Sequence, residues 1–181
     1  MKIVSGWGGS RKAEVEIITP NTVEQLQQLI RGSNQISLIA RGLGRSYGDA
    51  AQLSNGKVIN LHAFHHIHLD SSNASVTAGS GVSLDILLKK IVPKGFFLPV
   101  TPGTRNVTIG GAIAADIHGK NHHLDGSFGN HVSELILIDG TGSLKKLSPH
   151  NNSSEEEKSQ FWSTVGGMGL TGVIVEATFS L

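Results

Sequence analysis

The chain contains no cysteine, and this absence excludes several chemistries at once. Disulfide bonds, a thiolate nucleophile, an iron–sulfur cluster and attachment of a cofactor through sulfur all require a thiol side chain. An excess of charge of one sign is also lacking, because 15 lysines and arginines nearly balance 14 aspartates and glutamates. A net charge of +1 provides no extended basic surface, so we expect no nucleic-acid partner.

Long apolar runs are missing too. No stretch reaches the length of a membrane-spanning helix, and residues 1–6 lack the hydrophobic segment of a signal peptide. We therefore expect no transmembrane segment in these residues and a location that is cytoplasmic or associated with the cell envelope. The 181 residues suffice for one good-sized α+β core or for two small subdomains.

Glycine, in contrast, is abundant: it accounts for 23 of the 181 residues, roughly twice its usual share. One glycine-rich segment, Arg41–Asp49, reads R-G-L-G-R-S-Y-G-D and follows an apolar run, Ile36–Ala40, that predicts a buried strand ending in a tight turn. Glycine lets backbone N–H groups close on an anion, while the arginines, Ser46 and Tyr47 add charge and hydroxyl donors. The loop suits a pyrophosphate, and we expect Tyr47 to pack on the bound ligand.

This loop is neither of the two common nucleotide-binding motifs. Its glycines are spaced G-x-G-x-x-x-G, and the residues after Asp49 do not form a convincing amphipathic helix, which argues against a Rossmann fingerprint. No G-x-x-x-x-G-K-[ST] occurs, which excludes a P-loop. Taken alone, the segment is equally compatible with a plain glycine-rich connection.

A second glycine-rich segment, Pro102–His123, begins with a Pro-Gly turn and contains the run I-G-G-A-I-A-A. With Thr108 in front, Gly110 and Gly111 open a short helix whose free N–H groups and positive dipole end would face a phosphate or a ring carbonyl. The small residues would allow a flat group to approach closely. The alternative is a glycine–alanine helix packed tightly on a strand.

Histidines gather at the end of this segment, at His118, His122 and His123 around Lys120. Such side chains can bind an anionic substrate or pass protons, and histidine can hold a metal. Gly119 interrupts the i, i+4 histidine pair, no H-E-x-x-H occurs and no cysteine completes a soft site, so we expect no metal. A solvated run without function is one alternative; we favour a polar wall around a flavin or sugar-phosphate site.

Hydrophobic periodicity and turn residues predict an α+β fold. Helices are expected at 22–30 and 83–92, with a short one through Trp162 after a polar loop at 151–158. Strands are expected at 36–40, 57–61, 67–70, 75–79, 132–139, 143–147 and 173–181. We place two subdomains at 1–101 and 102–181, so that both glycine segments would reach a cofactor between them. Trp7 and Trp162 are expected to anchor the core, and His62, His65, His66 and His68 to be surface residues or satisfied partners.

The two segments, together with Gly6-Trp7-Gly8 and the run Phe161–Gly172 (F-W-S-T-V-G-G-M-G-L-T-G), resemble the vanillyl-alcohol oxidase type of FAD proteins. The resemblance extends from about Gly6 to the end. Within that family, A-R-G-L-G-R-S-Y-G-D and D-I-H-G-K-N-H-H are similar to the oxidases of polyprenyl-phosphate pentoses. The resemblance implies the two-subdomain, PCMH-type α+β fold, with FAD bound non-covalently in an extended form between the subdomains.

The resemblance also implies site residues, carried over position by position. Cofactor contacts are implied for Arg41, Gly42, Leu43, Gly44, Arg45, Ser46, Tyr47, Gly48, Asp49, Gly103, Thr104, Thr108, Ile109, Gly110, Gly111, Ala115, Asp116, Ile117, His118 and Ile174. Substrate contacts are implied for His118, Gly119 and Lys120, with His118 and Lys120 as candidate catalytic residues and neither singled out as the base. Relatives carry cysteine where this chain has Ala115, which non-covalent binding should tolerate.

The activity implied by the resemblance is that of an FAD-dependent oxidoreductase acting on a CH–OH group. The flavin would take hydride from C2 of a lipid-linked ribose, giving a 2-keto sugar on the route to cell-wall arabinan. An NADH-dependent reductase would be the partner that completes the epimerisation, and the family's C-terminal substrate domain is expected to be absent from these residues. The alternatives are another sugar, alditol or aldonolactone oxidase, and a non-catalytic flavin- or nucleotide-binding module.

Overall fold

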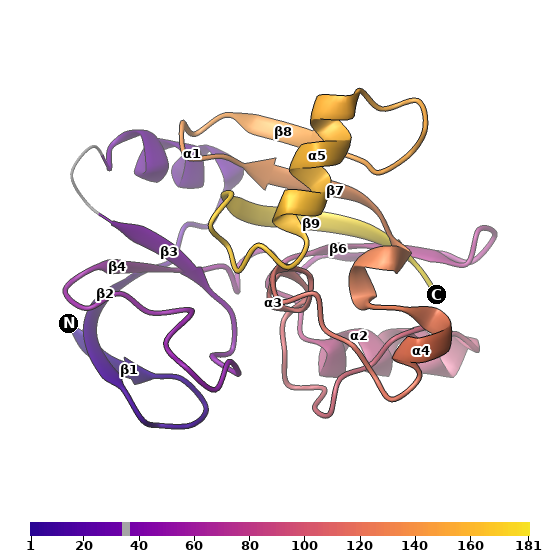
Figure 1. The fold of residues 1–181 in the computed structure, drawn as a ribbon, viewed down its shortest axis with the longest axis horizontal. Helices are drawn as coiled ribbons and strands as arrows, with labels where there is room; N and C mark the ends of the chain where they lie inside the picture. Colours follow the sequence, from indigo (N-terminus) through magenta and orange to yellow (C-terminus); the bar gives the residue numbers. More distant parts are fainter. Residues whose placement is uncertain (34–36) are drawn as a thin grey trace.

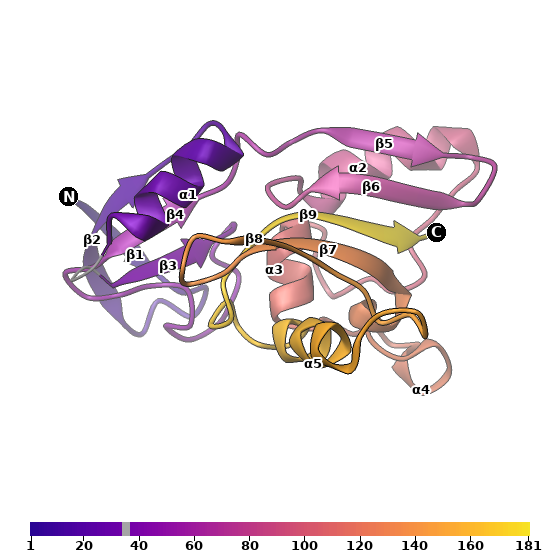
Figure 2. The same cartoon turned by 90° about the horizontal axis from the view of Figure 1, so that it is seen from above.

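Two sheets with helices packed around them make up the computed structural model, which describes residues 1–33 and 37–181 (Figure 1). The first sheet has the order β1 (Lys2–Ser5), β2 (Lys12–Ile18), β4 (Lys57–Asn60) and β3 (Leu38–Arg41). The second has the order β5 (Ile67–Asp70), β6 (Ser75–Gly79), β9 (Val173–Ser180), β7 (Val132–Ile138) and β8 (Leu144–Leu147). Figure 2 shows the two sheets in opposite halves of the molecule.

Strand direction differs between the sheets. In the first, β1 and β2 are antiparallel, whereas β2 and β3 both pair in parallel with β4. Parallel pairing puts Arg41 beside Asn60 at the carboxyl edge of the sheet, which is where ligands bind in many α/β folds. The second sheet is antiparallel, and the last strand, β9, pairs with both β6 and β7.

Most helices begin at a hydroxyl side chain. The helices are α1 (Val23–Arg31), α2 (Leu84–Ile91), α3 (Ile109–Ala114), α4 (His122–Asp125) and α5 (Glu155–Thr164), with 3₁₀ turns η1 (Val92–Lys94) and η2 (Phe128–His131). The side-chain oxygen that caps α1, α2, α3 or α5 accepts a hydrogen bond from the backbone N–H three residues further on. These caps are Thr22, Ser83, Thr108 and Ser154. Each such cap stabilises its helix by about 1 kcal/mol, so the local sequence sets where these helices start.

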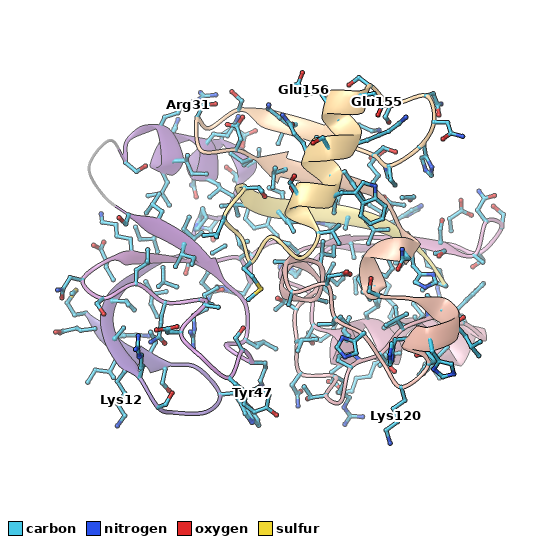
Figure 3. The ribbon with its side chains drawn as sticks, in the orientation of Figure 1. Lys12, Arg31, Tyr47, Lys120, Glu155 and Glu156 are labelled. Atoms are coloured by element: carbon cyan, nitrogen blue, oxygen red, sulfur yellow. The ribbon has the colours of Figure 1, made fainter. Side chains whose placement is uncertain are left out.

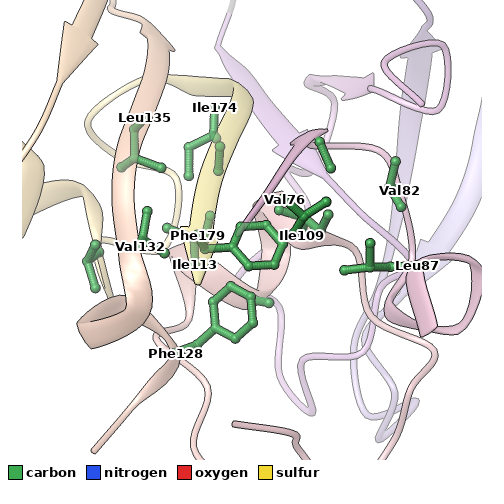
Figure 4. Close-up of a cluster of buried hydrophobic side chains, with 14 of the residues drawn as sticks. Val76, Val82, Leu87, Ile109, Ile113, Phe128, Val132, Leu135, Ile174 and Phe179 are labelled. Carbon is green, nitrogen blue, oxygen red and sulfur yellow. The ribbon is translucent and has the colours of Figure 1, made fainter. Parts of the chain in front are cut away.

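The short helix α3 is buried in the largest core. Its apolar residues Ile109, Ala112 and Ile113 are fully buried, and the helix contacts β6 and β9. Figure 4 shows Ile109 and Ile113 among these core side chains, near Phe128 and Phe179, whose ring centroids are 5.3 Å apart. Because α3 lies inside the molecule, its amino end and carboxyl end are fixed in place for whatever binds beside them.

The structure confirms most of the expected elements. The helices expected at 22–30 and 83–92 are α1 and α2, and the expected strands from 57–61 onward match β4 to β9 within a residue or two. The strand expected at 36–40 is β3, although Ile36 lies outside the described residues. The strands β1 and β2, which carry the Gly6-Trp7-Gly8 turn between them, were not among the predicted elements.

Three expectations differ from the structure. The polar stretch expected to be a loop up to residue 158 is helical from Glu155, because Ser154 and Glu157 form a capping box that starts α5. Trp7 and Trp162 are not core anchors, since their side chains are 54% and 47% exposed. The division between the two sheets falls between Asn60 and Ile67 rather than at residue 101, because β5 and β6 pair with β9. No helix within the described ranges is both long and apolar enough to cross a bilayer.

The turn after β5 gives a pH-dependent prediction. The Asp70 carboxylate accepts hydrogen bonds from Ser72 and Asn73, which lower the pKa of Asp70 from 3.8 to about 2. Because the folded pKa is below the unfolded one, this stabilisation is present above a pH of about 4 and is lost as the pH falls toward 2. We expect Asp70→Asn, which keeps an acceptor oxygen but cannot ionise, to be less stable than the parent at pH 7 and to lose less stability over that interval.

Urea unfolding of both proteins at a series of pH values measures this difference. The two stability curves should converge as the pH falls. Curves that stay parallel would show that the turn does not couple to folding.

Candidate cofactor site

The first glycine loop leaves the carboxyl end of β3 and is held from within by Arg41. The guanidinium donates hydrogen bonds to the carbonyl oxygens of Ser5 (2.7 Å) and Ala51 (3.0 Å), which tie the loop to β1. Gly44, with φ of +65°, lies against the same guanidinium, where a Cβ would come within 2.7 Å of Arg41 Cζ. Burial lowers the pKa of Arg41 from its ordinary value, but arginine remains charged at neutral pH. Arg41 therefore stabilises the conformation of the loop through these two hydrogen bonds.

The backbone donors of this loop are left free. Within residues 1–33 and 37–181, nothing accepts a hydrogen bond from the N–H groups of residues 43–46. Unpaired donors on consecutive residues form the kind of concavity that binds an anion. Arg45 also lines this region and adds a positive charge. Its Nε is buried without a partner in the described residues. The loop thus offers both dipoles and a cation to a phosphate.

The amino end of α3 faces the loop but does not have the free N–H groups that we expected. Ile109 N donates to Val82 O (2.8 Å), Gly110 N to Ser80 O (3.0 Å) and Gly111 N to the Thr108 hydroxyl (3.2 Å). The expectation of an open phosphate site at this helix was wrong, because α3 packs directly on the chain leaving β6. The tightly packed glycine–alanine helix, our alternative, is what forms.

The two glycine segments approach each other closely where Gly42 meets Thr108. A Cβ on Gly42 would overlap Thr108 Oγ1 and lie 3.3 Å from both Cβ and Cγ2 of that side chain. A similar close approach occurs between Gly110 and Ser80, where a Cβ would stand 2.9 Å from Ser80 Cβ. The absence of a side chain at Gly42 therefore lets the two glycine segments approach each other, and its absence at Gly110 lets α3 pack on the chain after β6.

A cavity of about 290 Å³ lies between the two segments. Its far wall is the turn before β9, which is fastened to the carboxyl end of α3. Gly166 N donates to Ile113 O (3.0 Å) and Met168 N to Ala114 O (2.8 Å). The lining combines small and apolar side chains, which suit a flat ring system, with the polar groups of the glycine loop. Ser80 also lines it, and its Oγ is buried without a partner in the described chain. This donor set fits an extended cofactor that carries phosphates.

Twelve of the residues implied by the resemblance line this cavity: Arg41, Gly42, Leu43, Gly44, Arg45, Ser46, Thr108, Gly110, Gly111, Ala115, Ile117 and Ile174. The other implied cofactor residues, Tyr47, Gly48, Asp49, Gly103, Thr104, Ile109, Asp116 and His118, lie outside its lining. The lining also includes residues that we did not predict: Ala40, Ala50, Ala51, Asn60, Leu61, His62, Ser80, Gly81, Val107, Ala114, Met168, Gly169 and Gly172.

Several of the residues outside the lining have other partners. Tyr47 is 77% exposed and projects from the edge of the molecule (Figure 3), so we no longer expect it to pack on a ligand within this chain. Asp49 pairs with Arg11 at 2.9 Å. Ile109 belongs to the core, and Asp116, with φ of +41°, accepts a hydrogen bond from Gly129 N at 2.9 Å.

A second, more open hollow of about 780 Å³ contains the residues implied for the substrate. His118, Gly119 and Lys120 line it, with Asn121, His122, Phe97, Leu98, Pro99, Thr101, Pro102 and Gly103. Asn121 anchors the segment by donating to Pro99 O at 2.8 Å, and the His118 and His122 rings are 5.5 Å apart. Ala115 and Ile117 line the first cavity and His118 the second, so a single segment passes from one to the other. In the described part of the chain, no three acidic or histidine side chains could hold a metal ion.

Comparison with known proteins defines the class. Residues 16–148 match the family model of the FAD binding domain, and the chain belongs to that family, whose cofactor is FAD. It is 44% identical to the decaprenylphosphoryl-beta-D-ribose oxidase of Mycolicibacterium smegmatis, over 99% of this chain and 39% of that protein. It is 25% identical to the D-lactate dehydrogenase of Anaerostipes hadrus, over 94% of this chain and 37% of the other. The chain thus spans about two fifths of the length of these relatives.

The contact between Gly42 and Thr108 gives a testable prediction. We expect Gly42→Ala to destabilise the protein by about 1–3 kcal/mol, because the added methyl overlaps the Thr108 side chain. Binding of FAD should weaken about tenfold or more as the two walls separate. Chemical unfolding and FAD titration measure the two effects. Gly140→Ala is the matched control, since a Cβ there meets nothing within 4 Å.

A double variant isolates the cause. Thr108→Ala alone removes a helix cap, at a cost of about 1 kcal/mol. In that background Gly42→Ala should cost much less than it does alone. Equal costs in both backgrounds would contradict the proposed overlap.

Proposed function

We propose that this chain is the FAD-binding part of an oxidoreductase that oxidises the C2 hydroxyl of decaprenylphosphoryl-β-D-ribose, or a closely similar polyprenyl-phosphate pentose, to a 2-keto sugar. The observation that carries the proposal is the 44% identity over 99% of the chain to a protein named for oxidising that sugar. The continuous segment from the cofactor cavity into the second hollow supports it, because such a reaction needs the two ligands in contact.

The first cavity would bind FAD, and the second hollow would bind the substrate. The N–H groups of the first glycine loop and the Arg45 guanidinium would hold the diphosphate of FAD. Ala114, Ala115 and Ile117 would lie along the ring system and keep water away from it. Bound there, FAD supplies the group that accepts hydride from the carbinol carbon. With alanine at 115, that residue offers no side-chain nucleophile, so we propose non-covalent binding.

The second hollow would hold the substrate. Lys120 supplies a compact positive charge suited to a phosphodiester. His118 stands where the segment leaves the cofactor cavity and, with Lys120, is our candidate for accepting the hydroxyl proton. Its backbone forms an isolated bridge with Ser127 that fixes its place. We infer that the complete substrate site needs polypeptide beyond these 181 residues.

An NADH-dependent reductase is the partner that we propose, since a 2-keto sugar must be reduced again to complete an epimerisation at C2. The product would serve arabinan synthesis in the cell wall. This role is compatible with a cytoplasmic or an envelope-associated location.

The first test is binding of FAD to the chain itself. We expect the 181-residue protein to bind FAD, with a shifted flavin absorbance and a raised melting temperature. FAD at a hundred times its dissociation constant should stabilise the fold by about 2.7 kcal/mol. Isothermal titration and thermal unfolding measure this. A protein that FAD neither binds nor stabilises would refute the FAD site, and with it the oxidoreductase.

The second test addresses the substrate. The protein that carries this chain with its substrate-binding region, loaded with FAD, should lose its flavin absorbance anaerobically when the lipid-linked ribose is added. D-Lactate, an alditol and an aldonolactone form the comparison panel, the first because a relative is named for it. Bleaching by one of these in place of the pentose would favour another oxidase or dehydrogenase. Binding of FAD without bleaching by any of them would favour a non-catalytic module.

A further inference from the structure

The turn between β1 and β2 lies against the outside of the first glycine loop. Trp7 N donates to Ser46 O at 2.7 Å and Gly8 N to Tyr47 O at 3.1 Å, so two successive carbonyl groups of the loop are bound by this turn. Gly6 has no room for a side chain, because a Cβ would overlap Gly48 O. The backbone of the turn therefore follows that of the loop closely.

The same turn contacts Arg45, the arginine of the loop whose side chain makes no hydrogen bond within the described residues. The Arg45 guanidinium lies over the Trp7 ring, with its Cζ 4.1 Å from the ring centroid. Within the described residues no atom forms a hydrogen bond or an ion pair with the Arg45 side chain, and its Nε is buried. Arg41, in contrast, donates hydrogen bonds to the carbonyl oxygens of Ser5 and Ala51. Arg45 is thus held by an aromatic face, which accepts none of its hydrogen bonds.

We propose that Trp7 is a positioning residue for the cofactor: its ring fixes the Arg45 guanidinium at the cavity so that the guanidinium can bind the diphosphate of FAD. This inference rests on the proposed FAD site and adds to it a residue that lies outside the cavity lining. An aromatic face suits this task because it orients a cation without accepting its hydrogen bonds. A carboxylate there would compete with the phosphates for the same donors.

The Trp7 ring is only partly covered by the rest of the chain. Its side chain is 54% exposed, so burial of apolar area is not its main contribution. Trp162 is exposed to a similar degree, at 47%, but packs edge-on against Phe161, at 5.0 Å between ring centroids. Trp162 is therefore a suitable control for Trp7: the two side chains are similarly exposed, but it is Trp7 whose ring lies against Arg45.

The test compares FAD affinity in Trp7→Leu, Trp7→Phe, Arg45→Gln and the double variant Trp7→Leu with Arg45→Gln, with Trp162→Leu as control. We expect Trp7→Leu to raise the dissociation constant of FAD about three- to tenfold, Trp7→Phe to restore most of the affinity, and Trp162→Leu to leave it unchanged. In the Arg45→Gln background, Trp7→Leu should have little further effect, because the guanidinium that it orients is gone.

Salt dependence separates positioning from a general loss of structure. The decrease of FAD affinity with ionic strength should become shallower in Trp7→Leu and in Arg45→Gln alike, since both remove the same cation from the diphosphate. Multiplying effects in the double variant, or an unchanged salt dependence in Trp7→Leu, would overturn the inference. If the parent protein fails to bind FAD, the proposed function itself falls; if it binds FAD and Trp7→Leu binds equally well, only this inference falls.

A spectroscopic measurement serves if Trp7→Leu does not fold. Trp162→Phe leaves Trp7 as the single tryptophan, and colourless inorganic pyrophosphate can be titrated against its fluorescence. We expect pyrophosphate to change the emission of Trp7 as Arg45 engages the anion. The change should be absent in the Arg45→Gln form of the same protein, and an equal response in both would contradict the coupling.

Discussion

The cofactor cavity depends on the contact between the bare Cα of Gly42 and the side chain of Thr108. Thr108 also caps α3 through its hydroxyl and accepts the helix's first i, i+4 hydrogen bond from Ala112 through its carbonyl. One residue therefore starts the buried helix, sets its distance from β3 and forms part of the cavity wall. A Cβ at residue 42 would overlap Thr108 Oγ1, so any side chain larger than hydrogen there requires the neighbouring atoms to shift.

The sequence predicted the elements whose signals are local. Helices α1 and α2 have hydroxyl caps and apolar residues at helical spacing, and the hairpin of β5 and β6 has a turn residue, Asp70, that binds its own turn. The prediction for α3 failed in one respect for a non-local reason. Its first N–H groups are satisfied by Val82 and Ser80, residues nearly thirty positions away whose approach no local pattern reveals.

The site shows the same limit. The glycine loop was recognisable because glycines, arginines and hydroxyls lie together in the chain. Asn60, in contrast, enters the cavity through its pairing with Arg41, and Ser80 through its backbone hydrogen bond to Val175. Met168 enters because its N–H is bound by Ala114. The sequence also could not distinguish Arg41 from Arg45. Both flank glycines, yet Arg41 donates to two carbonyl groups of the chain, whereas Arg45 Nε has no partner in the described residues.

The first glycine loop is anchored by hydrogen bonds to other parts of the chain and also has unpaired backbone N–H groups in the described chain. Its carbonyl groups at Ser46 and Tyr47 are bound from outside by the β1–β2 turn, while the N–H groups of residues 43–46 have no acceptor in the described chain. Each donor left without water or a partner costs free energy. A ligand with phosphate oxygens would accept these hydrogen bonds and remove that cost. Binding of FAD and stability of this loop should therefore rise together, because both come from the same donors.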